Sequence, residues 1–157
     1  MARVSDAEAV AAIYNAEVTG STVTFDIEPR TIAEQRRWIE HHQGVHPAVV
    51  ALEGTAVVGF GALSPFRDRP AYSTTVEDSV YVDAAWRGRG VGRLLLVELI
   101  SLAEKQGFHA VIARTSGDNN TSIALHQACG FTLVGVEREV GRKFGRWIDV
   151  AILQLLL

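Results

Sequence analysis

Apolar side chains recur at helical spacing over the first part of the chain. Ser5–Glu8 form a capping-box pattern. The apolar residues that follow share one helical face: Val10, Ile13, Tyr14 and Val18. They predict a helix over about residues 6–18. A second capping-box pattern at Thr31–Glu34 predicts another helix that ends near His42. Residues 19–30 between them are polar and contain Pro29, so we expect an irregular connection.

Short runs of apolar and β-branched residues replace this spacing in the middle of the chain. Residues 48–53 and 56–63 are separated by a Glu-Gly pair, which predicts a β-hairpin. Residues 64–71 carry prolines and arginines and predict a loop, and residues 74–82 predict a third strand. A strand before the first helix would be only a stub at residues 2–4.

Helix and strand patterns alternate in the second half of the chain. Val91, Leu95, Leu99 and Leu102 share one helical face, and Gly107 is expected to end that helix. The later segments are predicted as a strand over 110–114, a helix over 120–129, and strands over 131–139 and 147–156. The order αα, βββ, α, β, α, ββ indicates a mixed α/β domain with a central sheet and helices on both faces.

Composition narrows the classes of protein and partner. The 157 residues are 48% hydrophobic and 21% charged, which suits one globular domain over residues 1–157 and excludes a disordered or fibrous chain. The net charge of −3 supplies no basic field, so we expect neither nucleic acid nor a membrane as a partner. Cys129 is the only cysteine, which fits a reduced, cytoplasmic setting. His41, His42 and His46 lack a completing carboxylate or thiolate, so no metal site is expected.

A glycine- and arginine-rich segment lies between a predicted strand and a predicted helix. It reads Arg87-Gly88-Arg89-Gly90-Val91-Gly92-Arg93. The first N–H groups of a helix have no internal partners, and glycines allow a bulky anion to approach the backbone. The arginines add positive charge, so the segment predicts a phosphate or pyrophosphate site. The alternative is a tight turn with exposed arginines. The spacing matches neither a P-loop nor a Rossmann fingerprint.

Two motifs together resemble the Gcn5-related N-acetyltransferase (GNAT) superfamily. The first is Arg87-x-x-Gly90-x-Gly92, and the second runs from Asn119 through His126 to Gly130-Phe131. The resemblance implies a mostly antiparallel sheet of about six to seven strands with helices on both faces, acetyl-coenzyme A as co-substrate, and no metal. A closer likeness to phosphinothricin and methionine sulfoximine acetyltransferases is carried by four segments: residues 22–29, 67–72, 75–82 and 141–150.

The resemblance also implies a division of labour among the residues. The backbone of Val80, Tyr81 and Val82 would pair with the pantetheine arm, and the loop Arg87–Gly92, with Arg93, would hold the pyrophosphate. Asn119 and Ser122 would lie near the thioester. The acceptor would be a small-molecule amine, held by these residues: Phe25, Glu28, Arg67, Arg69, Tyr72 and Thr74. A homodimer is implied as well, with the C-terminal strands and the hairpin 144–147 as its interface.

Acetyl transfer to an amine needs a base, because aliphatic amines are protonated at neutral pH. Glu77 is the candidate, since strand alternation places it on one face with Ser79 and Tyr81 and away from the valines of the same strand. The Val82 N–H could donate to the thioester oxygen. His126 could protonate the leaving thiolate or order a water, although a lone helical histidine is often only structural.

Three functions remain open on the sequence alone. The leading interpretation is acetylation of a small amino-acid-like amine of the phosphinothricin, methionine sulfoximine or sulfone type. The second is acetylation of peptide or protein N-termini, which would need an open groove. The third is a catalytically silent acyl-coenzyme A sensor, against which Glu77 and His126 argue.

Overall fold

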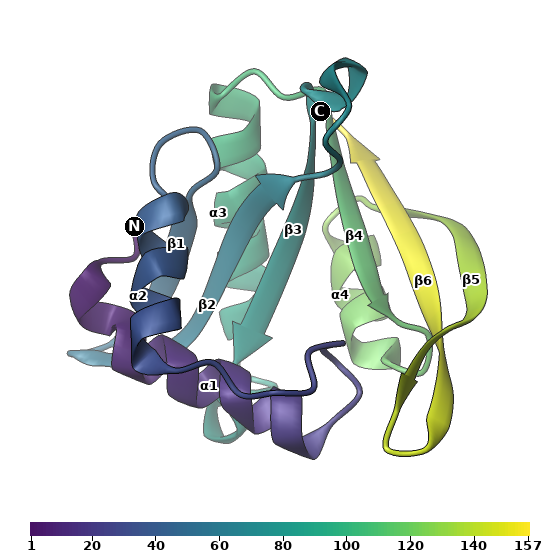
Figure 1. The fold of residues 1–157 in the computed structure, drawn as a ribbon. Helices are drawn as coiled ribbons and strands as arrows, with labels where there is room; N and C mark the ends of the chain where they lie inside the picture. The colour runs from purple at the N-terminus through teal and green to yellow at the C-terminus, as the bar shows by residue number, and fades with distance from the viewer.

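The computed structural model describes residues 1–157 and contains a six-stranded sheet in the order β1-β2-β3-β4-β6-β5 (Figure 1). The strands are β1 (Ala48–Glu53), β2 (Ala56–Pro65), β3 (Thr75–Val82), β4 (Ala110–Ser116), β5 (Thr132–Lys143) and β6 (Arg146–Leu156). Only β3 and β4 pair in parallel, and every other neighbouring pair is antiparallel. The predicted fold class is confirmed, with six strands.

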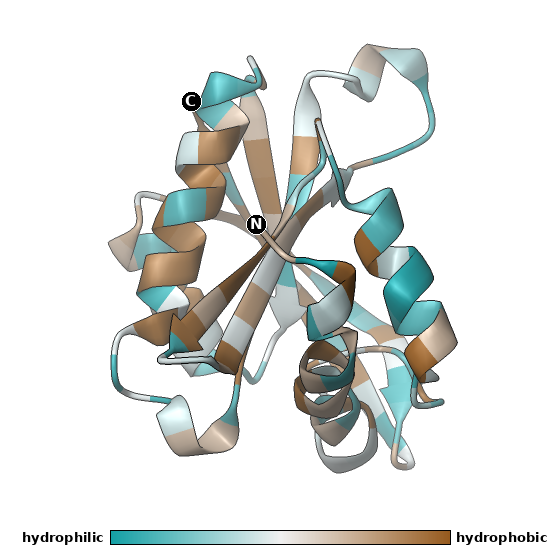
Figure 2. Ribbon diagram, turned by 90° about the vertical axis from the view of Figure 1, so that its left-hand side faces the viewer, coloured by the Kyte–Doolittle hydropathy of each residue, from teal (hydrophilic) through white to brown (hydrophobic).

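Helices cover both faces of the sheet (Figures 1 and 2). Helices α1 (Ala7–Gly20) and α2 (Ile32–His41) lie on one face, and α3 (Val91–Lys105) and α4 (Asn120–Ala128) lie on the other. Short 3-10 turns span Val4–Asp6, Pro70–Tyr72 and Ala84–Trp86. Each face has its own apolar core, one around Leu96 and Leu99, the other around Val10 and Ile39. No helix has the length and apolar character needed to cross a membrane.

The parallel strands β3 and β4 separate partway along their length. They pair only from Thr75 opposite Ala110 to Asp78 opposite Ala113. Beyond that point β3 follows β2 and β4 follows β6, so the two strands diverge, as the lower half of Figure 1 shows. The Asp83 N–H donates to the Val58 carbonyl of β2, so by alternation the peptide groups of Val80 and Val82 point into the gap. The sheet therefore offers an unpaired strand edge in its interior.

Helix starts follow the predicted capping in one of two cases. At α2 the Glu34 N–H donates to Thr31 Oγ1 and the Thr31 N–H donates to Glu34 Oε2, so the capping box is confirmed. At the first helix the prediction of Ser5 as the cap is wrong, because the Arg3 N–H donates to Asp6 Oδ2 and a 3-10 turn precedes α1. The N-terminal strand stub is replaced by one hydrogen bond from the Ala2 N–H to the Ala48 carbonyl.

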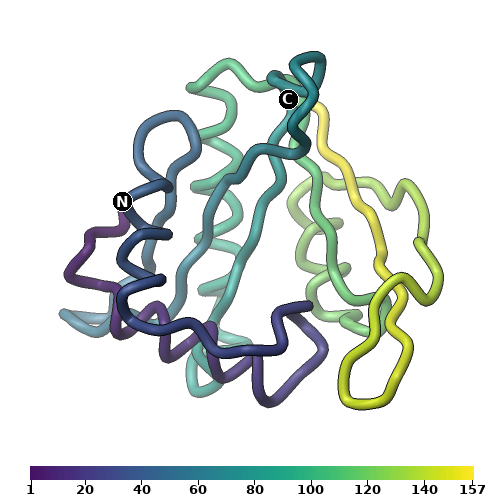
Figure 3. The backbone as a smooth tube through the Cα atoms, viewed as in Figure 1, coloured from purple at the N-terminus to yellow at the C-terminus, as the bar shows by residue number.

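The C-terminal hairpin is longer than its sequence pattern predicts. Strand β5 continues to Lys143, which pairs with Arg146 across a two-residue turn. Phe144 and Gly145 have φ angles of 53° and 74°, as a type I′ turn requires. The hairpin projects past the end of β4 and reaches toward the α1–α2 connection, a path that Figure 3 follows.

Candidate active site

A cavity of about 260 Å³ lies between the α1–α2 connection and the diverging part of the sheet. Its walls come from four parts of the chain: Val23, Thr24 and Phe25 of the connection, Glu77 and Tyr81 of β3, Arg114, Thr115 and Ser116 of β4, and Val150 of β6. The valines at 76, 80 and 82 instead pack into the core beneath α3 and α4. The predicted alternation of β3 is therefore confirmed, with Glu77 on the cavity side.

Glu77 is more basic than an ordinary glutamate. Burial raises the pKa of its carboxyl above the usual value, and the charges of Asp78 and Glu137 act in the same direction. The positive charges of Arg114 and Arg67 oppose this rise. A carboxylate with a raised pKa is a better proton acceptor near neutral pH, which suits a general base.

Sequence reasoning missed Arg114 and its partner Glu137. Arg114 Nη2 donates to Glu137 Oε2 at 2.5 Å, and Nη1 donates to Oε1 at 3.4 Å. Arg114 lies on the cavity wall two residues after Ile112, which is the β4 residue paired with Glu77. The sequence did show an arginine within the apolar run that predicts a buried strand. It could not show which other strand would supply a partner for that arginine.

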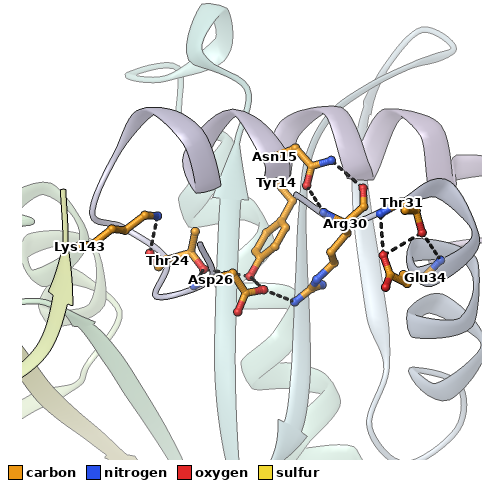
Figure 4. A network of polar contacts seen from close by, with 8 residues as sticks. All are labelled: Tyr14, Asn15, Thr24, Asp26, Arg30, Thr31, Glu34 and Lys143. Atoms are coloured by element: carbon orange, nitrogen blue, oxygen red, sulfur yellow. Dashed lines mark hydrogen bonds and ion pairs between the residues drawn. The ribbon is translucent and has the colours of Figure 1, made fainter. Parts of the chain in front are cut away.

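The α1–α2 connection is held over the sheet by buried polar contacts, drawn in Figure 4. Lys143 Nζ, on a residue only 4% exposed, donates to the Thr24 carbonyl at 2.8 Å. Tyr14 Oη donates to Asp26 Oδ2 at 2.6 Å and lies 2.9 Å from Thr24 Oγ1. Burial lowers the pKa of Lys143, and the nearby carboxylates of Asp26 and Glu17 only partly offset it. The connection is thus tied to both α1 and the C-terminal hairpin.

Phe25 lines the cavity and packs against the same hairpin. A Cβ on Gly141 would lie 2.2 Å from the Phe25 ring, so only glycine permits this approach. Phe25 is therefore the one predicted substrate residue that lines the cavity.

The other predicted acceptor residues lie elsewhere. The Arg67 guanidinium sits over the rings of Phe66 and Tyr72, 4.9 Å and 5.6 Å from their centroids, and its charge reaches Glu77 from outside the cavity wall. Arg69 and Thr74 are exposed on the β2–β3 connection. Glu28 lines a separate surface depression beside α2. The expected clustering of these side chains around one pocket is not observed.

The glycine loop begins α3 in the expected manner. Gly88 and Gly90 have φ angles of 72° and 84°, and a Cβ at either position would meet nothing within 4 Å. Open space above left-handed glycines at a helix N-terminus is what close approach of a phosphate requires. Arg89, stacked over Trp86 at 4.8 Å, and the exposed Arg93 flank the loop. These residues fit a pyrophosphate group.

Arg87, expected to help hold the pyrophosphate, contacts Glu17 and Val82 in this structure. Its guanidinium pairs with Glu17 of α1, and Nε donates to the Val82 carbonyl at 3.2 Å. Glu17 is 8% exposed and its other oxygen accepts from Ser21 Oγ at 2.6 Å. Arg87 therefore links the glycine loop to α1 in this structure.

His126, a candidate for protonating the leaving thiolate or ordering a water, is buried against β3. It is 4% exposed, Nδ1 donates to the Ser122 carbonyl at 2.7 Å, and Nε2 lies 3.1 Å from Asp78 Oδ2. Asn119 caps α4 by accepting from the Ser122 N–H, which leaves its amide NH₂ group free. The histidine turns toward β3, where Asp78 is its only carboxylate partner.

Both ring nitrogens of His126 point at acceptors, so the imidazolium form satisfies both contacts. Burial alone would lower the pKa of His126. The hydrogen bond and charge of Asp78, with the Ser122 carbonyl, outweigh burial and raise it. Its surroundings thus favour the imidazolium form, and the ring joins α4 to β3.

Comparisons with known proteins agree with this architecture. Residues 10–131 match the model of the acetyltransferase (GNAT) family. A phosphinothricin N-acetyltransferase of Streptomyces coelicolor is 41% identical over 88% of this chain and 84% of its own length. An L-methionine sulfoximine/L-methionine sulfone acetyltransferase of Pseudomonas paraeruginosa is 37% identical over 99% of this chain and 92% of its own length.

A solved structure shares nearly the whole fold. It is a phosphinothricin acetyltransferase from Sinorhizobium meliloti in complex with acetyl-coenzyme A, with a TM-score of 0.96, 39% identity, and coverage of 99% of this chain and 85% of that chain. Because the family model matches most of the chain and the relatives match over most of their length, the chain belongs to the GNAT family of acetyltransferases.

Proposed function

We propose that this acetyltransferase moves the acetyl group of acetyl-coenzyme A to the primary amine of a small amino-acid-like acceptor of the phosphinothricin, methionine sulfoximine or methionine sulfone type. The observation that carries the proposal is the cavity of about 260 Å³, with Glu77 on its wall. A volume of this size suits a small molecule better than a peptide chain. The names of the two relatives support the same acceptor class.

Acetyl-coenzyme A, the acetyl donor, would lie along the diverging strands β3 and β4. The peptide groups of Val80 and Val82 would hold the pantetheine arm as an added strand, and the loop Gly88–Gly92 with Arg89 and Arg93 would hold the pyrophosphate. The free amide of Asn119 and the Ser122 hydroxyl would approach the thioester end. Acetyl-coenzyme A supplies the activated acyl group, and no metal is needed.

Glu77 would take the proton from the acceptor ammonium, directly or through a water, so that the amine can attack the thioester. The Val82 N–H, in the gap beside the cavity, would donate to the oxygen on which charge develops. His126 is a weaker candidate for protonating the thiolate, because its burial and its contact with Asp78 support a positioning role.

The test is turnover of Glu77→Gln with a panel of phosphinothricin, methionine sulfoximine, methionine sulfone, ordinary amino acids and a short peptide. Loss of a general base is expected to lower kcat by about 10²–10⁴-fold with acetyl-coenzyme A binding unchanged. Glu104→Gln, on the exposed face of α3, is the matched control. Turnover of the peptide alone would replace the small-molecule proposal. Cofactor binding without any turnover in the wild type would favour the sensor function.

We also propose a homodimer. Strand β5 is a sheet edge and leaves a row of large apolar side chains exposed: Leu133, Val134, Val136 and Val140, with Phe144 and Trp147 on the hairpin. An apolar edge of this kind favours burial against a second copy. Sedimentation equilibrium checks it, and a monomer at micromolar concentration would rule it out.

A further inference from the structure

An ion pair lies beside Glu77 on the same face of the sheet. Glu77 is paired with Ile112 across β3 and β4, and Arg114 follows two residues later, so the side chains of Glu77 and Arg114 point the same way. Glu137 reaches Arg114 from β5, across β6, in a two-pronged contact at 2.5 Å and 3.4 Å. Both partners are about one-third exposed, so solvent only partly screens their charges.

Arg114 and Glu137 have opposite effects on the carboxylate of Glu77. Arg114 places a positive charge near the buried carboxylate of Glu77, yet its guanidinium is bound by Glu137 and forms no ion pair with Glu77. Without Arg114, Glu77 would stay buried and lose the positive charge that lowers its pKa the most. Without Glu137, Arg114 would be free to pair directly with Glu77 and cover the atom that must take the proton.

We infer that Arg114 and Glu137 are positioning residues that keep Glu77 ionised and uncovered, ready to accept the proton of the acceptor amine. This inference rests on the proposed role of Glu77 as the base. It adds residues that the family motifs did not point to, because neither lies in the glycine loop or in the segments that carried the closer likeness.

The other charged groups around Glu77 are few. Asp78 follows it on β3 and is bound by His126 on the opposite face, and Arg67 acts from the β2–β3 connection. Tyr81 shares the cavity wall, and the residues of the α1–α2 connection on that wall, Val23 to Phe25, carry no titratable side chain. The Arg114–Glu137 pair is therefore the charged pair that β4 and β5 place near the base, and its two members act on the pKa of Glu77 in opposite directions.

The experiment compares the pH dependence of kcat/KM for the acceptor, at saturating acetyl-coenzyme A, in Arg114→Gln and Glu137→Gln. Arg114→Gln should move the acid limb to higher pH, and Glu137→Gln should move it to lower pH. On that limb a displacement of one pH unit changes the rate about tenfold. Arg138→Gln, an exposed neighbour on β5 with the same change of charge as Arg114→Gln, should leave the limb in place.

If the pair had a purely structural role, both variants would have a lower maximal kcat/KM, but their acid limbs would not move in opposite directions. Unmoved limbs, or limbs moved the same way, would overturn the inference. The titration of Glu77 itself, followed by carbon NMR and assigned with Glu77→Gln, separates the two proposals. If Glu77→Gln stays active but the Glu77 titration still shifts oppositely in the two variants, the base is elsewhere and the electrostatic effect of the pair stands. If Glu77→Gln is inactive and the titration does not shift, the base stands and the pair has no role.

Discussion

Replacing His126 with leucine would leave the Asp78 carboxylate buried without its partner. Asp78 is 6% exposed, its Oδ2 is bound only by His126, and its Oδ1 has no hydrogen-bond partner at all. Removing one member of a buried ion pair costs about 3–5 kcal/mol in the free energy of unfolding. For a domain of this size that corresponds to a fall in Tm of about 6–20 °C. Leucine keeps much of the side-chain volume, so the loss would come from the charge and not from a void.

The measurement is urea unfolding of His126→Leu, Asp78→Asn and the double variant. Because Asp78→Asn removes the stranded charge, the double variant should be more stable than His126→Leu alone. A cost below about 1 kcal/mol for His126→Leu, or additive effects of the two changes, would refute the reasoning.

The pH dependence has a fixed sign. The pKa of His126 is raised in the folded protein, so its stabilisation is fully present below the ordinary histidine pKa of about 6.5 and is lost as pH rises through the folded value. The difference in unfolding free energy between wild type and His126→Leu should therefore shrink toward alkaline pH. A difference that grows with pH would mean that the ring is not held as a cation. If kcat of folded His126→Leu falls by about 10²-fold or more while Asp78→Asn stays active, His126 is the proton donor to the thiolate.

Three further changes test the cavity wall and the glycine loop. Gly141→Ala should push the Phe25 ring from the cavity and raise KM for the acceptor, with acetyl-coenzyme A affinity unchanged, whereas Gly135→Ala on the same strand meets nothing within 4 Å and should have no effect. Arg87→Gln should lower stability by about 1–2 kcal/mol in thermal unfolding, because it strands the buried Glu17 carboxylate and the arginine itself is half exposed. Arg89→Gln should instead weaken acetyl-coenzyme A binding, measured by calorimetry, with little change in stability.

Local rules in the sequence determined several features of the site. The Thr31–Glu34 capping box begins α2, because its partners are only three residues apart. Alternation along β3 placed Glu77 on the side opposite Val76, since successive strand residues point to opposite faces. Gly88 and Gly90 adopt the left-handed backbone conformation that glycine reaches most easily, directly before a helix. Each of these depends on neighbours within a few positions of the chain.

Tertiary structure alone decided which side chains meet. Arg114 finds Glu137 across 23 residues, His126 finds Asp78 across 48, and Arg87 finds Glu17 across 70. Periodicity places each side chain on a face of its own element, but it carries no information on which strand lies next to which. The order β3-β4-β6-β5, and the separation of β3 from β4 after four paired residues, set those distances. The sequence therefore determined the elements and the donor loop, and long-range packing determined the partners that hold Glu77, Arg87 and His126.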